Sequence, residues 1–158
     1  MIRFIALLML ILPLLARADM GEAIQAYGEG DYKKALVVFR EFAEKNDVEG
    51  QYFLGFFYHH GYGLERNQGE AIKWFLKAAN QGNARSQYYV GIMTAKGEGV
   101  AKDPVAGYMW LAISALNPAT KERDKHYTME EMEKVAKKLK PEDVQKAVAM
   151  AKAWKPGG

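Results

Sequence analysis

Residues 51–79 read QYFLGFFYHHGYGLERNQGEAIKWFLKAA, and residues 87–115 read QYYVGIMTAKGEGVAKDPVAGYMWLAISA. Both segments open with Gln-Tyr and carry a glycine four positions later, a Gly-x-Gly in the middle and a tryptophan near the end, always 36 residues apart. A fixed period of roughly 20 to 50 residues indicates a stack of one repeated structural unit. The chain is therefore predicted to be a solenoid, whose units bury their apolar faces on each other and expose a long surface.

Each unit is predicted to be a pair of antiparallel helices. In the second unit Asn83 caps the first helix, and the apolar residues after it recur at helical spacing. Gly91 lies inside that helix, where glycine costs about 1 kcal/mol relative to alanine, so we expect the partner helix to pack closely against it. Gly97 ends the helix in the left-handed conformation, and Asp103 with Pro104 begins the second helix.

The shared pattern, Q-x-x-L-G-x-x-Y-x-x-G-x-G-[LV]-x-x-[ND]-x-x-x-A-x-x-W-x-x-x-A-A-x-x-G, resembles the Sel-one-like repeat, a variant of the tetratricopeptide superhelix. Residues 47–82 follow it nearly throughout. Residues 83–117 depart from it at Thr94, where an aromatic residue is expected, and at Gly107, where alanine is expected. The resemblance implies an all-α fold, a tetratricopeptide-like α-solenoid of antiparallel helix pairs.

The segments on either side extend the same architecture into a single α-solenoid domain over residues 19–158. Residues 19–46 resemble a degenerate tetratricopeptide-like unit that lacks the Gly-x-Gly loop. Residues 118–154 lose the repeat pattern and are predicted to form a C-terminal capping helix pair, because terminal units of a solenoid are atypical. Lys140 stands where small secreted relatives have a hydroxyl residue as the cap of the last helix, which weakens that helix start by about 1 kcal/mol.

The N-terminus reads as a secretory signal peptide, residues 1–18. Arg3 precedes an apolar run over residues 4–15, and Ala16-Arg17-Ala18 matches a cleavage site. The run has 12 residues and a membrane span needs roughly 20, so we expect cleavage after Ala18 and no stable membrane insertion afterwards. An uncleaved anchor is the alternative. The predicted localisation is periplasmic or secreted.

Composition limits the classes of partner. The chain has no cysteine, so no disulfide framework stabilises it. Removing Arg3 and Arg17 leaves 20 basic and 19 acidic residues, a net charge of +1 that argues against a nucleic-acid partner. Lysines nevertheless gather near the C-terminus, at Lys134, Lys137, Lys138 and Lys140. They favour a solvated helix end, with an anionic partner as the alternative.

The sequence offers few residues that could catalyse a reaction, and we predict neither an enzyme nor a bound cofactor. The only serines, Ser86 and Ser114, lie at small-residue repeat positions and begin no S-x-x-K motif. His59 and His60 are adjacent and point about 100° apart on a helix, so they do not share a metal ion easily. His126 is isolated, and no Gly-rich phosphate loop is present. No catalytic, cofactor-binding or metal-binding residues are predicted.

The remaining candidate is a binding surface. In superhelices of the kind that the sequence resembles, the first helix of each pair lines the concave side. Six residues there are not required by the repeat and fall at a spacing of four: Tyr52, Phe56, His60, Tyr88, Ile92 and Lys96. An alternative is that the aromatic members only pack against neighbouring helices. The tryptophans of the second helices, Trp74 and Trp110, are expected to anchor the core instead.

These observations predict a non-enzymatic, exported adaptor that binds another protein through the concave face of its superhelix. Two alternatives stay open. One is a module that binds carbohydrate or peptidoglycan, which exposed tyrosines and Trp154 would support, so that cell-wall components are a second class of partner. The other is a hydrolase acting on cell-wall or β-lactam substrates, for which the sequence lacks both clustered carboxylates and a serine motif.

Overall fold

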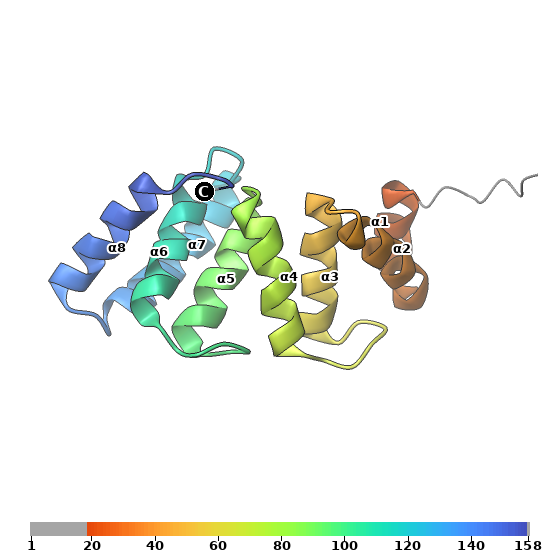
Figure 1. Cartoon of the computed structure of the whole chain (residues 1–158), viewed down its shortest axis with the longest axis horizontal. Helices are drawn as coiled ribbons and strands as arrows, with labels where there is room; N and C mark the ends of the chain where they lie inside the picture. The colour runs from red at the N-terminus through yellow and green to blue at the C-terminus, as the bar shows by residue number, and fades with distance from the viewer. Residues whose placement is uncertain (1–18, 158) are drawn as a thin grey trace, which may run out of the picture.

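The computed structural model describes residues 19–157, and all regular structure in this range is α-helical (Figure 1). The helices are α1 (Met20–Gly28), α2 (Tyr32–Glu44), α3 (Val48–His60), α4 (Gln68–Asn80), α5 (Ala84–Lys96), α6 (Pro104–Leu116), α7 (Glu122–Ala136) and α8 (Pro141–Ala153). They stand in a row from α1 and α2 at one end to α8 at the other. The predicted all-α solenoid is confirmed. The predicted signal peptide, residues 1–18, lies outside the described residues.

The helices of the two repeats begin and end at polar caps and glycines, as their sequence predicts. Asn83 accepts a hydrogen bond from the backbone N–H of Ser86 and so caps α5. Asp103 accepts from two backbone N–H groups at the start of α6. Gly97 ends α5 in the left-handed conformation, with φ of 81°. By contrast, Lys140 provides no side-chain cap for α8, as expected from its missing hydroxyl.

The two helices of each repeat meet at a glycine. A Cβ atom at Gly91 of α5 would lie 2.7 Å from Cγ and 2.9 Å from the backbone N of Leu111 in α6. A Cβ atom at Gly55 of α3 would lie 2.9 Å from the ring of Phe75 in α4. Carbon atoms in favourable contact are about 3.5 to 4.0 Å apart, so only glycine fits these helix crossings. The predicted close packing at Gly91 is confirmed.

The core is anchored by the residues that follow the tryptophans. Phe75 and Leu111 are fully buried, whereas Trp74 and Trp110 are only partly buried at the edge of the core. The Nζ atom of Lys77 lies 3.9 Å from the centre of the Trp74 ring and covers its outer side. The expectation that the tryptophans anchor the core holds only in part, because they pack against the core without being buried in it. The helix turns its next residue inward, toward the glycine of the partner helix.

A buried amide ties together the two helices of each repeat. The glutamine that opens the repeat motif, Gln51 or Gln87, is almost fully buried. Gln81 donates from Nε2 to Oε1 of Gln51 at 2.8 Å, and Asn117 donates from Nδ2 to Oε1 of Gln87 at 2.9 Å. Both donors lie just after the second helix of a repeat and 30 residues beyond the glutamine that they reach. Since an unpaired buried amide is costly, these bonds stabilise the pairing of the two helices within each repeat.

The C-terminal helices do not form a regular repeat. Both α7 and α8 pack against α6 rather than against each other, with α7 behind α6 and α8 beside it in Figure 1. The tail after α8 turns back over the stack, where the backbone N–H of Gly157 donates to the carbonyl of Asn80 at 2.9 Å. The predicted capping pair is thus two separate helices on α6. Because α7 only touches α5 lightly, a crevice remains between these two helices.

Candidate functional site

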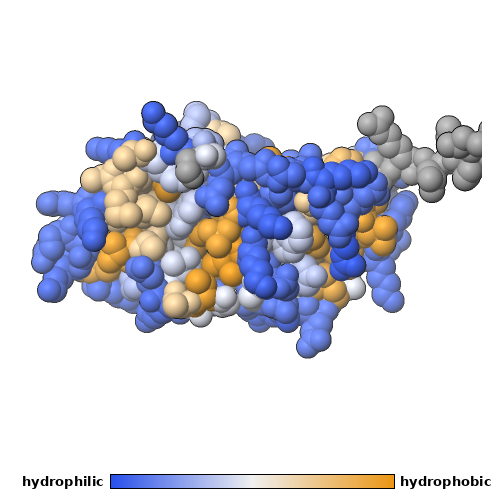
Figure 2. Space-filling view, viewed as in Figure 1, coloured by the Kyte–Doolittle hydropathy of each residue, from blue (hydrophilic) through white to orange (hydrophobic). Residues whose placement is uncertain are grey.

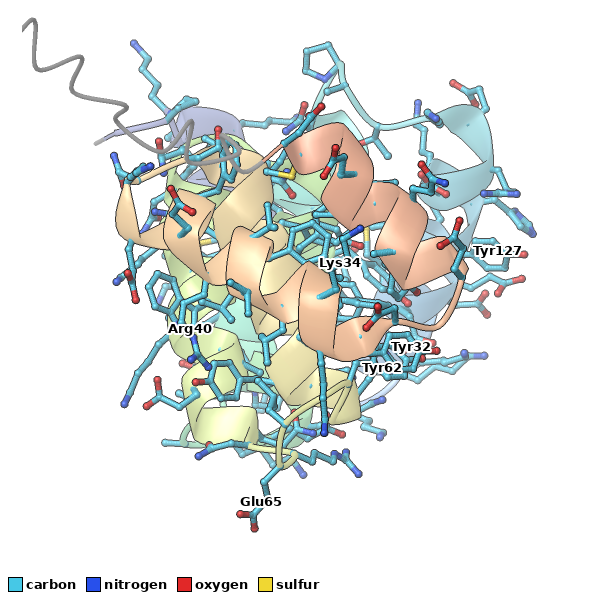
Figure 3. All side chains as sticks on the ribbon, turned by 90° about the vertical axis from the view of Figure 1, so that its right-hand side faces the viewer. Tyr32, Lys34, Arg40, Tyr62, Glu65 and Tyr127 are labelled. Carbon is cyan, nitrogen blue, oxygen red and sulfur yellow. The ribbon has the colours of Figure 1, made fainter. Side chains whose placement is uncertain are left out.

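Aromatic side chains gather on the face formed by the odd-numbered helices α1, α3, α5 and α7, here called the odd-helix face. One group, the aromatic cluster, comes from α1, the start of α2, α3 and the loop after α3: Tyr27, Tyr32, Phe56, His60 and Tyr62. Tyr62 stacks on Tyr32 and on His60, with ring centres 4.5 and 5.3 Å apart. In Figure 3, Tyr32 and Tyr62 lie together, toward the same side of the molecule as Tyr127 of α7.

Three of the predicted binding residues lie on α3, and they differ in accessibility. Phe56 is half-buried and His60 is exposed, with ring centres 4.3 Å apart, so both contribute to the surface of the aromatic cluster. Tyr52 is only 6% exposed and belongs to the core. The guanidinium of Arg85 lies 4.1 Å from the centre of the Tyr52 ring and covers it. The expectation that the repeat core does not need Tyr52 is therefore wrong.

Tyr89, which the sequence analysis did not select, joins the two predicted groups. Its ring stacks on Phe75 with centres 4.6 Å apart and also contacts Phe56 and Tyr88, at 6.0 and 5.6 Å. Burial, and secondarily Tyr52 and other tyrosines, raise the pKa of Tyr89 well above its ordinary value, so the phenol stays protonated. The 36-residue register pairs Tyr89 with Phe53, a core residue, which is why the pattern alone did not point to the surface.

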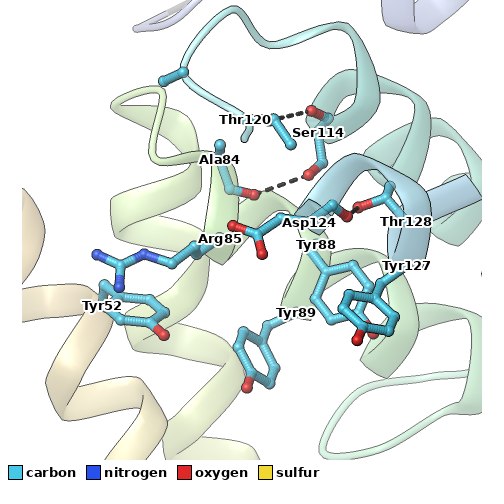
Figure 4. A pocket seen from close by; sticks show the side chains of 11 residues that line it. Tyr52, Ala84, Arg85, Tyr88, Tyr89, Ser114, Thr120, Asp124, Tyr127 and Thr128 are labelled. Carbon is cyan, nitrogen blue, oxygen red and sulfur yellow. Dashed lines mark hydrogen bonds between the residues drawn. The ribbon is translucent and has the colours of Figure 1, made fainter. Parts of the chain in front are cut away.

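The other three predicted residues, Tyr88, Ile92 and Lys96, lie along α5 and face the crevice between α5 and α7. This α5–α7 crevice contains two cavities. The first, of about 220 Å³, is the aromatic cavity; its lining includes Tyr52, Tyr88, Tyr89 and Tyr127 (Figure 4). The second, of about 120 Å³, is the lysine cavity; its lining includes Ile92, Val135, Lys96, Lys134 and Lys138. The structure therefore places the predicted α5 residues along the α5–α7 crevice, with Tyr88 at the first cavity and Ile92 and Lys96 at the second.

Charged groups flank the crevice unevenly. At the aromatic cavity, Arg85 pairs with Glu49 at 2.6 Å, and Asp124 supplies a carboxylate nearby. At the lysine cavity, Lys134 pairs with Glu131 at 2.6 Å. Within residues 19–157, no carboxylate oxygen lies within 4.0 Å of Lys96 or Lys138. The lysine cavity therefore carries an excess of positive charge.

His60 and Tyr88 on the odd-helix face also have shifted protonation equilibria. Burial lowers the pKa of His60, and the neighbouring His59 and Arg66 lower it further, so the neutral imidazole prevails at neutral pH. Burial raises the pKa of Tyr88, and Glu131 of α7 adds to this effect. At neutral pH this face thus presents neutral aromatic rings, and its charge comes from the lysines and carboxylates at its edges.

The serine and histidine side chains that catalysis or metal binding would need are buried, hydrogen-bonded to other groups or distant from one another. Ser86 is fully buried, and the Oγ atom of Ser114 donates to the carbonyl of Ala84 at 2.9 Å. The imidazole of His59 is hydrogen-bonded to the side chain of Gln68 at 2.8 Å. Between residues 19 and 157, no three His, Cys, Asp or Glu side chains come close enough together to hold a metal ion.

The fold and this face define a helical repeat protein of the α-solenoid class. A model of the Sel1 repeat matches residues 48–83 and 84–117. These bounds fall at the starts of α3 and α5 and at the end of α6, so each match covers one helix pair. Residues 48–117 are thus two repeats of the Sel1 type, and Sel1 repeat proteins generally mediate protein–protein interactions.

Two solved structures share the fold. The chain is 26% identical to a protective antigen of uropathogenic Escherichia coli strains that displays an SLR fold, with a TM-score of 0.76 over 85% of this chain and 28% of the antigen. It is 24% identical to a Sel1 repeat protein from Oxalobacter formigenes, with a TM-score of 0.65 over 84% of this chain and 56% of that protein. A segment of 68 residues, 43% of this chain, is 35% identical to DAP3-binding cell death enhancer 1 of the rat. The chain spans 13% of that rat protein and less than two thirds of either structure.

Proposed function

We propose that this protein is a non-enzymatic, exported adaptor that binds a partner protein through its odd-helix face. The observation that carries the proposal is the run of half-buried aromatic rings across two consecutive repeats, from Phe56 and Tyr62 through Tyr89 to Tyr88. Aromatic side chains dominate binding hot spots because they bring a large contact area into a desolvated pocket. On the opposite face, charged and polar side chains cover most of the surface, with hydrophobic side chains in separate stripes (Figure 2).

A protein partner is favoured over a carbohydrate by how the rings are arranged. A sugar stacks on an open ring face, but Tyr62 stacks nearly parallel to both Tyr32 and His60, which cover its faces. Edges and hydroxyl groups remain accessible, and these suit the mixed apolar and polar contacts of a protein interface. Cell-wall components are therefore the second candidate class of partner.

Export rests on the sequence of residues 1–18, in which Arg3, an apolar run and Ala16-Arg17-Ala18 follow the pattern of a cleavable signal peptide. The absence of activity is supported by the buried Ser86, the engaged Ser114 and the dispersed histidines. A general acid–base or nucleophilic site needs such groups within hydrogen-bond reach of one another.

The test is affinity capture with the immobilised mature chain, residues 19–158, against an extract of the source cells that includes cell-wall material. Tyr127→Asp places a charge on an exposed side chain of α7 beside the aromatic cavity. Val37→Asp is the control, because Val37 is also an exposed hydrophobic residue but lies on α2. We expect a protein captured by the wild type to be lost with Tyr127→Asp and kept with Val37→Asp. Equal capture by both variants, or retention of glycan alone, would rule out the proposal.

A further inference from the structure

The α5–α7 crevice has dimensions that fit a short extended peptide. Tyr88 lines the aromatic cavity and Lys96 lines the lysine cavity, two helical turns further along α5. At a rise of 1.5 Å per residue, these positions are about 12 Å apart. A helix about 10 Å wide does not enter cavities of about 220 and 120 Å³, whereas an extended strand bridges this distance with three or four residues.

The aromatic cavity suits a large apolar side chain. Four tyrosine rings contribute to its wall, and the methyl groups of Ala84 and Ala119 complete the apolar part of its lining. A cavity of about 150 Å³ accommodates a benzene ring, so about 220 Å³ holds one aromatic or leucine-sized side chain. Arg85 does not offer a full charge here, because Glu49 already pairs with it.

The lysine cavity suits an acidic group. Its floor is apolar, with Ile92, Ala95 and Val135, and three lysines stand against one glutamate around it. Lys134 satisfies that glutamate, Glu131, so Lys96 and Lys138 provide the excess charge. A carboxylate placed between them gains two favourable charge contacts, each modest in strength because both lysines are exposed.

We propose that the α5–α7 crevice binds an extended acidic segment of the partner protein, with an apolar side chain in the aromatic cavity and a carboxylate between Lys96 and Lys138. This rests on the proposed function. The spacing follows from the distance between the cavities: the acidic residue lies three or four positions from the apolar one. The chain's own residues 1–18 contain no acidic residue and so do not fit the lysine cavity.

The probe is a phage-displayed library of random decapeptides, selected on the immobilised mature chain. We expect the enriched peptides to carry Phe, Tyr, Trp or Leu three or four positions from Asp or Glu. The affinity of the best synthetic peptide is then measured by titration calorimetry. Enrichment of peptides without an acidic residue, or no enrichment at all, overturns the proposal.

The paired variants separate charge recognition from folding. Lys96→Gln with Lys138→Gln should weaken binding of the peptide by about three- to tenfold, since each exposed charge contact contributes modestly. Lys146→Gln with Lys155→Gln removes the same charge from exposed positions outside the crevice and should leave affinity unchanged. Tyr88→Ala should weaken binding at least fivefold. Equal effects of the two lysine pairs contradict the proposal.

Three further outcomes separate this inference from the proposed function. If the protein captured from the extract is retained fully by the Lys96 and Lys138 double variant, the odd-helix face binds a partner but the acidic segment is wrong. If light scattering shows a dimer of the mature chain that Tyr88→Ala dissociates, a second copy occupies the crevice and the inference also fails. If the extract yields no protein partner, the proposed function itself fails.

Discussion

Replacing Gly91 by alanine tests the helix crossing on which the repeat stack depends. The added Cβ atom would lie 2.7 Å from Cγ and 2.9 Å from the backbone N of Leu111. The leucine side chain is able to rotate away from the first contact, but the second involves the main chain of α6. Relief of this contact therefore requires α5 and α6 to move apart by several tenths of an ångström, which loosens the packing of buried neighbours such as Met93.

The magnitude follows from two opposing terms. Alanine is favoured over glycine inside a helix by about 1 kcal/mol. Overpacking a well-packed interior costs about 1 to 3 kcal/mol, and contact with a backbone atom places Gly91→Ala in the upper part of that range. The net expectation is a loss of about 1 to 2 kcal/mol in the free energy of unfolding, with a larger loss for Gly91→Leu. For a domain of this size, that corresponds to a fall of about 2 to 8 °C in Tm.

The assay is urea unfolding of the mature chain, followed by circular dichroism, with the free energy obtained by linear extrapolation. Gly28→Ala provides the matched control, because Gly28 also lies in a helix but a Cβ atom there would meet nothing within 4 Å. We expect this control to be neutral or up to about 1 kcal/mol more stable than the wild type. If Gly91→Ala is also as stable as the wild type, α5 and α6 are not in the close contact described, and the packing argument is refuted.

Three further predictions address the core, a buried phenol and the N-terminus. Phe75→Ala should cost about 3 to 5 kcal/mol in urea unfolding and Trp74→Ala clearly less, because only the phenylalanine is fully buried; a reversed order would contradict the assigned faces. The pKa of Tyr89 is raised in the folded state, so its contribution to stability is complete below about pH 10 and falls as the pH rises above that value. The urea midpoint of the wild type should therefore decrease between about pH 8 and pH 10.5, and Tyr89→Phe should make that decrease smaller. An unchanged decrease would show that the phenol does not resist ionisation. Mass spectrometry of the exported protein should find an N-terminus directly after Ala18, and a chain that retains residues 1–15 would exclude this cleavage.

The repeat architecture could be predicted because its signals are local and occur twice. The caps at Asn83 and Asp103, the helix end at Gly97 and the packing glycine Gly91 each follow from the conformational preference of one residue type. The 36-residue register then repeats these signals and removes ambiguity about where helices begin. Such agreement between local preference and global pattern is what makes a fold readable from one sequence.

The faces of the helices were harder to predict than their ends. Helical spacing shows that Tyr52 and Phe56 share a side of α3, but it does not show what covers them. Tyr52 is buried among other aromatic rings, including Phe75 and Tyr89, and Arg85 of the next repeat lies over its ring. Arg85 is 33 residues further along the chain, so no periodicity predicts this contact. In the same way, Trp74 and Phe75 are adjacent large apolar residues, and only the position of Gly55 on the partner helix decides which of them turns inward.

The side of the crevice opposite α5 is formed by α7, a helix that lacks the repeat pattern. The register that selected Tyr88, Ile92 and Lys96 has no counterpart on α7, so sequence alone did not bring Tyr127 or Lys138 to the same site. The two terminal helices, α7 and α8, each pack against α6 instead of against each other. This arrangement places α7 beside α5, with only light contact between α7 and α5. A regular fourth repeat would bury much of α7 against its own partner helix. The atypical end of the solenoid thus closes the stack and also leaves the α5–α7 crevice open. Lys134 and Lys137 pair with glutamates of α7, while Lys134 and Lys138 both line the crevice.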